Sequence, residues 1–227
     1  MSSDKKTICI VGGTGAEGSG LAARWAAHGH RVIIGSRDAS KAQSTVDALN
    51  ALTGKNNVEG MESRAGVAQA DIVVLTVPFS AQRSTVEGLK DALAGKVLID
   101  VTVPLVPPKV STVQLPESDS CVVAIQKLLG EQTKVVSAFQ NVSAHKLKDL
   151  NYQIECDVLV ASDDVEARQI GMMLARDAGL RGIDAGVLAN SVVAESFTSV
   201  LIWINRKYKI PDAGIRITGL GGEEAKA

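Results

Sequence analysis

The sequence feature that most constrains this chain is a cluster of glycines between an apolar segment and an alanine-rich one. The segment Thr7–Val11 predicts a strand, and Leu21–His28 predicts a helix. Between them, Gly13, Gly15 and Gly18 follow the spacing GxGxxG. Such glycines allow a tight turn, bring backbone N–H groups onto a pyrophosphate and let the helix pack on the strand. Because strand, turn and helix follow in the required order, the segment predicts a dinucleotide-binding site.

The same alternation of β-branched segments and alanine-rich segments continues along the chain. Strands are predicted at Thr7–Val11, Arg31–Gly35, Asp71–Val77, Val97–Val101, Lys134–Ala138 and Asp157–Ala161. Helices are predicted at Leu21–His28, Ser40–Leu49, Ser80–Leu93, Ser120–Leu129 and Val165–Asp177, followed by the glycines Gly29, Gly54, Gly95, Gly130 and Gly179. Each glycine suits a left-handed helix end. The alternation predicts an α/β fold built on a doubly wound parallel sheet.

The pattern changes in the second half of the chain. Four of the six prolines (Pro104, Pro107, Pro108 and Pro116) concentrate in one excursion after a strand, which indicates a functional loop. The units become less regular after residue 145, so we predict a dinucleotide-binding domain at 1–145 and a small C-terminal α/β lobe at 146–227. A final helix at Asn190–Tyr208 carries an apolar stripe made of Leu188, Val192, Val193, Phe197, Val200, Leu201 and Ile204.

The residues after the second predicted strand indicate which dinucleotide binds. A NAD site would place Asp or Glu there to bind the ribose hydroxyls, whereas this chain has Ser36 and Arg37. A guanidinium offers paired donors to a 2′-phosphate, and Lys41 lies about one helical turn further on. Asp38 can cap the following helix. The sequence therefore favours NADP over NAD.

Charge and cysteine content exclude several other classes of protein. With 24 basic and 25 acidic side chains the formal net charge is −1, which gives no field for nucleic acid or an anionic membrane. Cys9, Cys121 and Cys156 are widely spaced, form no metal-binding motif and suit a reducing cytoplasm. The polar start of the chain predicts no signal peptide.

One segment could be mistaken for a membrane span. Ala185–Asn205 carries a single charge, Glu195. Polar residues within it, among them Asn190 and Ser191, favour a buried or subunit-interface helix instead.

No side chain stands out as a general acid or base. Tyr152 and Tyr208 lack a partner lysine at the spacing that alcohol dehydrogenases use, and His145 has no evident orienting carboxylate. His28 and His30 lie at the end of the first helix that is remote from the glycine turn, so we predict a structural role for them. Hydride transfer between two redox cofactors needs alignment rather than an acid or base. The absence therefore favours cofactor-to-cofactor transfer.

Several motifs together resemble the family of F420-dependent NADP oxidoreductases. They begin with Gly12-Gly13-Thr14-Gly15 and Gly35-Ser36-Arg37, and continue over the segments 104–110, 136–142, 156–160, 184–186 and 214–219. The resemblance runs in order over nearly the whole chain. It implies a Rossmann-type domain with a small C-terminal domain, a homodimer, and reversible hydride transfer between the nicotinamide of NADP(H) and the deazaflavin coenzyme F420.

The resemblance also implies roles for individual residues. Thr14, Gly15, Ala16 and Glu17 would contact the cofactor phosphates, and Ser36, Arg37 and Lys41 the 2′-phosphate. Val77, Ala81, Val106 and Ala144 would line the rest of the cofactor path, while Gln140, Asn141, Val142 and Asn190 would form the deazaflavin pocket. Ser143 departs from the family pattern, which has proline there.

Three other functions fit parts of the sequence. An NADPH-dependent flavin or ferric reductase would share the fold but use FMN or FAD. An NADP(H)-binding sensor would bind the cofactor without turnover. A hydroxyacid dehydrogenase is the least favoured, because the chain lacks the long helical domain of such enzymes.

Overall fold

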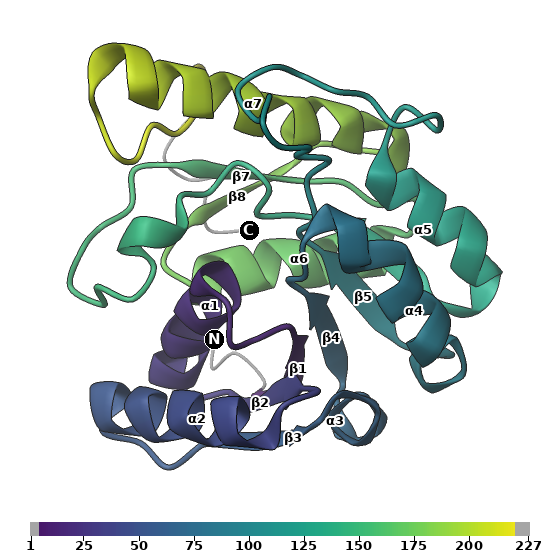
Figure 1. Cartoon of the computed structure of the whole chain (residues 1–227), viewed down its shortest axis with the longest axis vertical. Coiled ribbons are helices and arrows are strands. Elements are labelled where there is room, and N and C mark those ends of the chain that lie inside the picture. The colour runs from purple at the N-terminus through teal and green to yellow at the C-terminus, as the bar shows by residue number, and fades with distance from the viewer. Residues whose placement is uncertain (1–4, 221–227) are drawn as a thin grey trace.

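The computed structural model describes residues 5–220 and places six strands in one parallel sheet. The strand order is β3-β2-β1-β4-β5-β6 (Figure 1), which is the order of a Rossmann fold. The strands are β1 (Thr7–Val11), β2 (Arg31–Ser36), β3 (Val58–Glu62), β4 (Ile72–Leu75), β5 (Val97–Asp100) and β6 (Lys134–Ser137). The predicted Rossmann-type, doubly wound parallel sheet is confirmed.

Both faces of this sheet are buried under helices. Alternate residues of β1 point to opposite faces, so Ile8 and Ile10 belong to one hydrophobic cluster and Cys9 and Val11 to the other. The first cluster includes apolar residues of α1 (Ala16–His28), α2 (Ala39–Thr53) and α6 (Val165–Asp177). The second includes those of α3 (Ser63–Gln69), α4 (Phe79–Leu93) and α5 (Cys121–Leu129). The result is a three-layer α/β/α arrangement.

The chain after β6 adds a second, smaller sheet. Strands β7 (Asp157–Val160) and β8 (Arg181–Asp184) pair in parallel, and a bridge between Ser137 and Ala161 joins them to β6. The helix α6 between them packs against α1, where the indole N–H of Trp25 donates to the Leu174 carbonyl at 2.9 Å. Since one core cluster contains residues from both sides of residue 145, the domain boundary stays a prediction.

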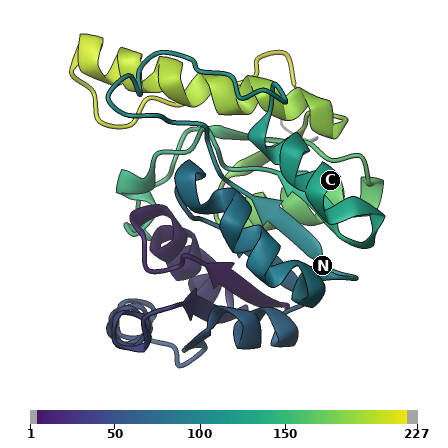
Figure 2. The same ribbon diagram turned by 45° about the vertical axis from the view of Figure 1, so that its right-hand side comes forward.

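The last helix, α7 (Ser191–Tyr208), lies along one end of the molecule, beside the proline-rich loop that follows β5 (Figures 1 and 2). The Arg206 guanidinium donates to Ser111 Oγ in that loop at 3.1 Å. Within residues 5–220, no helix is long and apolar enough to cross a membrane.

The apolar stripe predicted for α7 is only partly buried. Leu188 and Leu201 are buried and Val193 and Val200 are exposed, while Val192, Phe197 and Ile204 are half-buried. The fully buried residues of α7 are mostly small or polar: Ser191, Ala194, Glu195, Ser199 and Leu201. Polar partners explain why such residues are buried. Both carboxylate oxygens of Glu195 accept hydrogen bonds at the start of α5, from the Cys121 N–H at 2.9 Å and from Ser120 Oγ at 2.6 Å.

Candidate functional site

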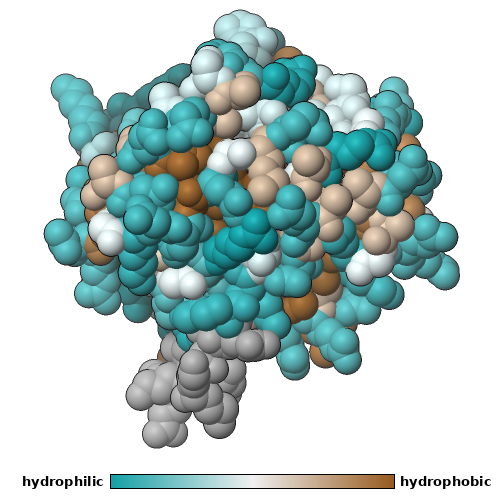
Figure 3. All heavy atoms as spheres, turned by 90° about the horizontal axis from the view of Figure 1, so that it is seen from below, coloured by the Kyte–Doolittle hydropathy of each residue, from teal (hydrophilic) through white to brown (hydrophobic). Residues whose placement is uncertain are grey.

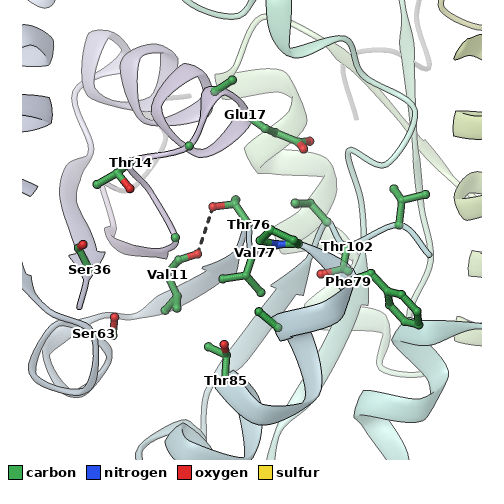
Figure 4. Close-up of a pocket in the computed structure, with 18 of the residues that line it drawn as sticks. Val11, Thr14, Glu17, Ser36, Ser63, Thr76, Val77, Phe79, Thr85 and Thr102 are labelled. Carbon is green, nitrogen blue, oxygen red and sulfur yellow. Dashed lines mark hydrogen bonds between the residues drawn. The ribbon is translucent and has the colours of Figure 1, made fainter. Parts of the chain in front are cut away.

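A large cleft opens where the strand order reverses, between the carboxyl ends of β1 and β4. It has a volume of about 960 Å³, at the upper end of the range for small-molecule sites. Gly12 follows β1 and Thr76 follows β4, and the Thr76 hydroxyl donates to the Val11 carbonyl at 3.1 Å (Figure 4). Open parallel sheets bind their ligands at this switch point.

The glycine turn contains glycines that packing requires, such as Gly18, and one that packing does not require, Gly15. A Cβ at Gly18 would lie 2.5 Å from Thr76 Oγ1, so only glycine lets α1 approach β4 this closely. A Cβ at Gly15, on the cleft wall, would meet no atom nearer than 3.5 Å. The first backbone hydrogen bond of α1 is donated by the Ser19 N–H to the Gly15 carbonyl. The N–H groups that precede Ser19 in α1 therefore have no partner within the helix and can bind an anion.

Positive side chains lie at the β2 end of the cleft. Ser36, Arg37 and Lys41 all line it. The Asp38 carboxylate instead caps α2, accepting from the backbone N–H of Ser40 at 3.0 Å and of Lys41 at 3.1 Å. The hydrogen bond from the Ser40 hydroxyl, together with those from the backbone, holds the pKa of Asp38 below its usual value. The capping role expected for Asp38 is confirmed, so Arg37 and Lys41 are left to attract an anion.

The opposite end of the cleft contains a buried polar atom without a partner. The Gln140 side-chain N–H donates to the Asp100 backbone carbonyl at 2.7 Å, but Gln140 Oε1 has no hydrogen-bond partner within residues 5–220. Gln140 lines the cleft and is almost fully buried. An unsatisfied buried polar atom costs about 1–3 kcal/mol, so this oxygen favours a ligand that carries hydrogen-bond donors.

One buried carboxyl group, that of Asp100, and one half-buried carboxyl group, that of Glu17, lie on or under the cleft wall. Burial raises the pKa of Asp100 to about 6, while the Thr102 N–H and the Gln82 amide hold its carboxylate. Burial also raises the pKa of Glu17, in the first turn of α1, to about 8. Glu17 points into the cleft on the side opposite Ser36 (Figure 4).

Comparison with known proteins identifies the family. The family described as "NADP oxidoreductase coenzyme F420-dependent" matches residues 7–104. The F420-dependent NADP reductase of Methanothermobacter thermautotrophicus is 40% identical over 224 residues, covering 96% of this chain and 97% of the relative. This chain belongs to the F420-dependent NADP reductase family. The reductase of Methanocaldococcus jannaschii is 38% identical over 94% of this chain and 98% of its own length.

Solved structures agree with the fold of the F420-dependent NADP reductase family. A protein from Arthrobacter sp. FB24, provisionally described as an F420-dependent NADP-reductase, superposes with a TM-score of 0.78 at 23% identity. The superposition covers 94% of this chain and 99% of that structure. A pyrroline-5-carboxylate reductase from Coxiella burnetii gives a TM-score of 0.60 at 18% identity, over 98% of this chain and 75% of its own. At these identities the likeness shows the fold alone.

Most residues that the family resemblance singled out meet in the cleft. It brings together Thr14, Gly15, Ala16, Glu17, Ser36, Arg37, Lys41, Val77, Ala81, Gln140 and Val142. Gly13 and Gly18 are buried behind the turn. The remaining four residues are not among those lining the cleft: Val106, Ala144, Asn141 and Asn190. The cofactor role of every one of the residues singled out stays a prediction. The Asn141 amide donates to the Asp157 carbonyl at 2.6 Å, and that of Asn190 to the Ala185 carbonyl at 2.6 Å.

The cleft also contains residues that the sequence analysis missed. They are Ser63, Thr76, Pro78, Phe79, Thr85, Val101, Thr102, Val103, Leu105 and Thr198. Thr76 directly follows β4 and Thr102 is the second residue after β5, at the carboxyl edge of the sheet, a position that could have identified them. Thr198, on α7, donates to the Gln140 carbonyl at 2.6 Å and carries no local signal in the sequence.

A group of potential metal ligands lies away from the cleft, at the amino end of β2. Within residues 5–220, ligand atoms of His28, His30 and Asp177 lie within 4.8 Å of one another. His30 Nδ1 accepts from the Lys6 N–H at 3.1 Å, and His30 Nε2 lies 2.9 Å from Asp177 Oδ2. Nε2 therefore carries the ring hydrogen and has no lone pair for a metal. We assign a structural role to these three residues, because they join the start of β2 to the end of α6.

Proposed function

We propose that this protein is an NADPH:F420 oxidoreductase that transfers a hydride reversibly between NADP(H) and the deazaflavin coenzyme F420. The observation that carries the proposal is one cleft with two chemically different ends. One end has helix N–H groups and two cations for phosphates, and the other has the unpaired Gln140 Oε1 beside apolar side chains. Membership of the family supports both cofactors.

The residues of the cleft bind the two cofactors and align their rings, and they take no chemical part in the hydride transfer. NADPH supplies a hydride at its nicotinamide, and the deazaflavin accepts it. The backbone N–H groups of Thr14, Ala16 and Glu17 hold the diphosphate, while that of Gly15 donates to the Gly12 carbonyl within the turn. Ser36, Arg37 and Lys41 hold the 2′-phosphate. Apolar side chains such as Val77 and Val142 exclude water from the space between the rings, and Gln140 offers a hydrogen-bond acceptor there. Alignment can lower the barrier to hydride transfer by about 7–11 kcal/mol. The proton that completes reduction of the deazaflavin comes from solvent.

The direct test mixes purified protein with NADPH and F420 and follows the absorbance of both. We expect the F420 band to bleach with NADPH and much more slowly with NADH. Cofactor binding without bleaching would contradict the proposal and favour a sensor.

A second candidate is an NADPH-dependent flavin or ferric reductase. Metalloreductase STEAP3 of Rattus norvegicus is 27% identical over 199 residues, and the match covers 88% of this chain and 37% of STEAP3. A parallel assay with FMN and ferric citrate tests this candidate, and turnover with FMN but not F420 would favour it.

The outer face of α7 supports a homodimer. Val193, Val200 and Trp203 project from it at helical spacing, and they are 48%, 40% and 58% exposed. The opposite side of the molecule, seen in Figure 3, is mostly hydrophilic, with hydrophobic side chains confined to small areas. A second copy of the chain would bury the α7 face around a two-fold axis. Three buried free cysteines agree with a cytoplasmic protein.

We therefore expect Trp203→Glu to weaken or abolish the dimer. The substitution places a charge in the middle of an apolar interface, which typically costs several kcal/mol. Light scattering after size-exclusion chromatography should give twice the chain mass of 23.7 kDa for the native protein and the mass of one chain for the variant. Leu52→Glu is the matched control, because Leu52 is an exposed apolar residue of α2. A native protein that runs as a monomer would refute the interface.

A further inference from the structure

The turn that follows β6 is strained where it forms one wall of the cleft. Phe139 is buried and has a left-handed backbone with φ 73°, a conformation that is costly for a bulky side chain. Its neighbours Gln140 and Val142 line the cleft. A strained residue keeps its conformation only where the surrounding structure holds it. The contacts that hold this turn therefore set the position of the cleft wall.

Hydrogen bonds from two elements hold Gln140. On β5, the Asp100 backbone carbonyl accepts from the Gln140 side chain at 2.7 Å. On α7, the Thr198 hydroxyl donates to the Gln140 backbone carbonyl at 2.6 Å, and Thr198 itself lines the cleft. Because the bond from Thr198 acts on the backbone of the turn, it fixes the strained segment against α7.

A buried glutamate one turn before Thr198 holds α7 in place. The Glu195 carboxylate accepts from the Ser120 hydroxyl at 2.6 Å and from the Cys121 N–H at 2.9 Å. These donors are the cap and the first residue of α5, where a negative charge is favourable. The Ser191 hydroxyl lies 2.7 Å from that of Ser120 and adds a second contact. The start of α7 is therefore seated on the start of α5.

We propose that Thr198 is a positioning residue for hydride transfer and that Glu195 acts through it: α7, seated on α5, holds the Gln140 turn and so sets the alignment of the two rings. The inference rests on the proposed function, which places the rings beside Gln140 and Val142. Reacting atoms must lie about 3–3.5 Å apart, and a misplacement of about 1 Å can cost about 100-fold in rate. Releasing the turn from α7 should therefore slow the transfer without weakening NADPH binding at the phosphate end of the cleft.

The test compares Thr198→Val, which removes the hydroxyl and keeps the side-chain shape, with Thr133→Val. Thr133 is the matched control, because its buried hydroxyl also donates to a backbone carbonyl, that of Leu93 at 2.9 Å, at the end of the sheet opposite the cleft. We expect both variants to lower the urea midpoint. Only Thr198→Val should slow single-turnover transfer from NADPH to F420 at saturating concentrations, by about 10- to 100-fold. Its Kd for NADPH should change less than about twofold.

Hydrogen–deuterium exchange of the cofactor-free protein reports on the turn itself. The Val142 N–H donates to the Phe139 carbonyl at 3.1 Å, so its exchange measures how often the turn opens. We expect the segment 139–143 to exchange faster in Thr198→Val and at the native rate in Thr133→Val. Thr198→Ser keeps the hydroxyl and should restore both the exchange and the transfer rate.

A double-mutant cycle tests the part assigned to Glu195. Glu195→Gln puts an amide N–H group against the donors of α5, so it should also slow the transfer. If Glu195 acts through Thr198, the loss in Glu195→Gln/Thr198→Val is smaller than the product of the two single losses. Independent losses that multiply would remove Glu195 from the inference.

The outcomes separate this inference from the proposed function. Equal transfer rates in the native protein and Thr198→Val would overturn the inference and leave the proposed function intact. Equal loss of rate in Thr133→Val, or native exchange of the turn in Thr198→Val, would overturn it as well, because the effect would not pass through the turn. A native protein that transfers no hydride to F420 would overturn the proposed function, and this inference with it.

Discussion

Replacing Arg24 by leucine is expected to lower the free energy of unfolding by about 3–5 kcal/mol. Arg24 lies on α1 and is 7% exposed. Its Nε donates to the Leu147 carbonyl at 2.8 Å and its Nη1 to the Ala178 carbonyl at 3.0 Å. Its Nη2 donates to the carbonyls of Lys146, Asp149 and Tyr152 at 2.9 to 3.2 Å. Leucine would leave all five carbonyls without this donor in a region that little water reaches.

The position of Arg24 explains why one residue has so large an effect. Ala178 caps the carboxyl end of α6, where a cation is favoured, and 146–152 is the loop that follows the Gln140 segment of the cleft. Arg24 therefore joins the N-terminal helix to two later segments. Its charge has no carboxylate hydrogen-bond partner and is stabilised by carbonyl dipoles.

Urea denaturation measures the effect, with Arg83→Leu as the control. Arg83 is an exposed arginine of α4 that pairs with Glu87 at 2.9 Å, and such helix pairs contribute about 0.3–0.5 kcal/mol. Arg24→Lys should fall between the two, because lysine keeps the charge but has fewer donors. If Arg24→Leu lowers the free energy of unfolding by an amount within about 1 kcal/mol of that for Arg83→Leu, water must hydrogen-bond the five carbonyls in place of Arg24.

The elements that sequence reasoning identified are those with a strong apolar pattern. The buried strands β1, β2, β4, β5 and β6 are β-branched runs, and α6 was predicted with its observed bounds, Val165–Asp177. All five helix-ending glycines have positive φ, but Gly130, with ψ −161°, does not adopt the predicted left-handed helical conformation. The predicted first helix began too late, because glycines at its start obscured the onset at Ala16.

The elements that were missed lie at edges or are short. In β3 only Val58 is buried and two of its five residues are glutamates, so no alternation is visible. β8 has no fully buried residue, and α3 has seven residues, too few for a helical period. These elements form because neighbouring strands and helices hold them, and a sequence pattern does not carry that information.

The residues of the cleft likewise divide into those that the local sequence identifies and those that only the fold identifies. Residues adjacent to a motif, such as Thr14 and Arg37, follow from the sequence, because strand ends and glycine turns fix their place. Thr198 and Arg24 act over long range: Thr198 bonds Gln140, 58 residues away, and Arg24 bonds Ala178, 154 residues away. In the sequence Arg24 resembles a solvated arginine on an alanine-rich helix, so only the fold identifies its role.

Replacing Arg37 by alanine is expected to weaken NADPH binding by about 10- to 150-fold and NADH binding by less than about threefold. Charge-assisted hydrogen bonds contribute about 1.5–3 kcal/mol, and each 1.4 kcal/mol corresponds to a tenfold change in Kd. Arg37 is exposed at the β2 end of the cleft, and the Asp38 carboxylate is engaged with α2, so the guanidinium is available to the 2′-phosphate. NADH lacks that phosphate, and its affinity should therefore hardly change.

Fluorescence titration of both reduced cofactors measures this difference, with Arg31→Ala as the matched control. Arg31 lies at the other end of β2 and pairs with Glu59 on the surface, away from the cleft. Added salt should weaken NADPH binding to the native protein more than to Arg37→Ala, because screening acts on the charge that the variant has lost. Equal losses for NADPH and NADH would place Arg37 at a group that both cofactors share, such as the diphosphate, and would leave Lys41 and Ser36 to account for any preference for NADPH.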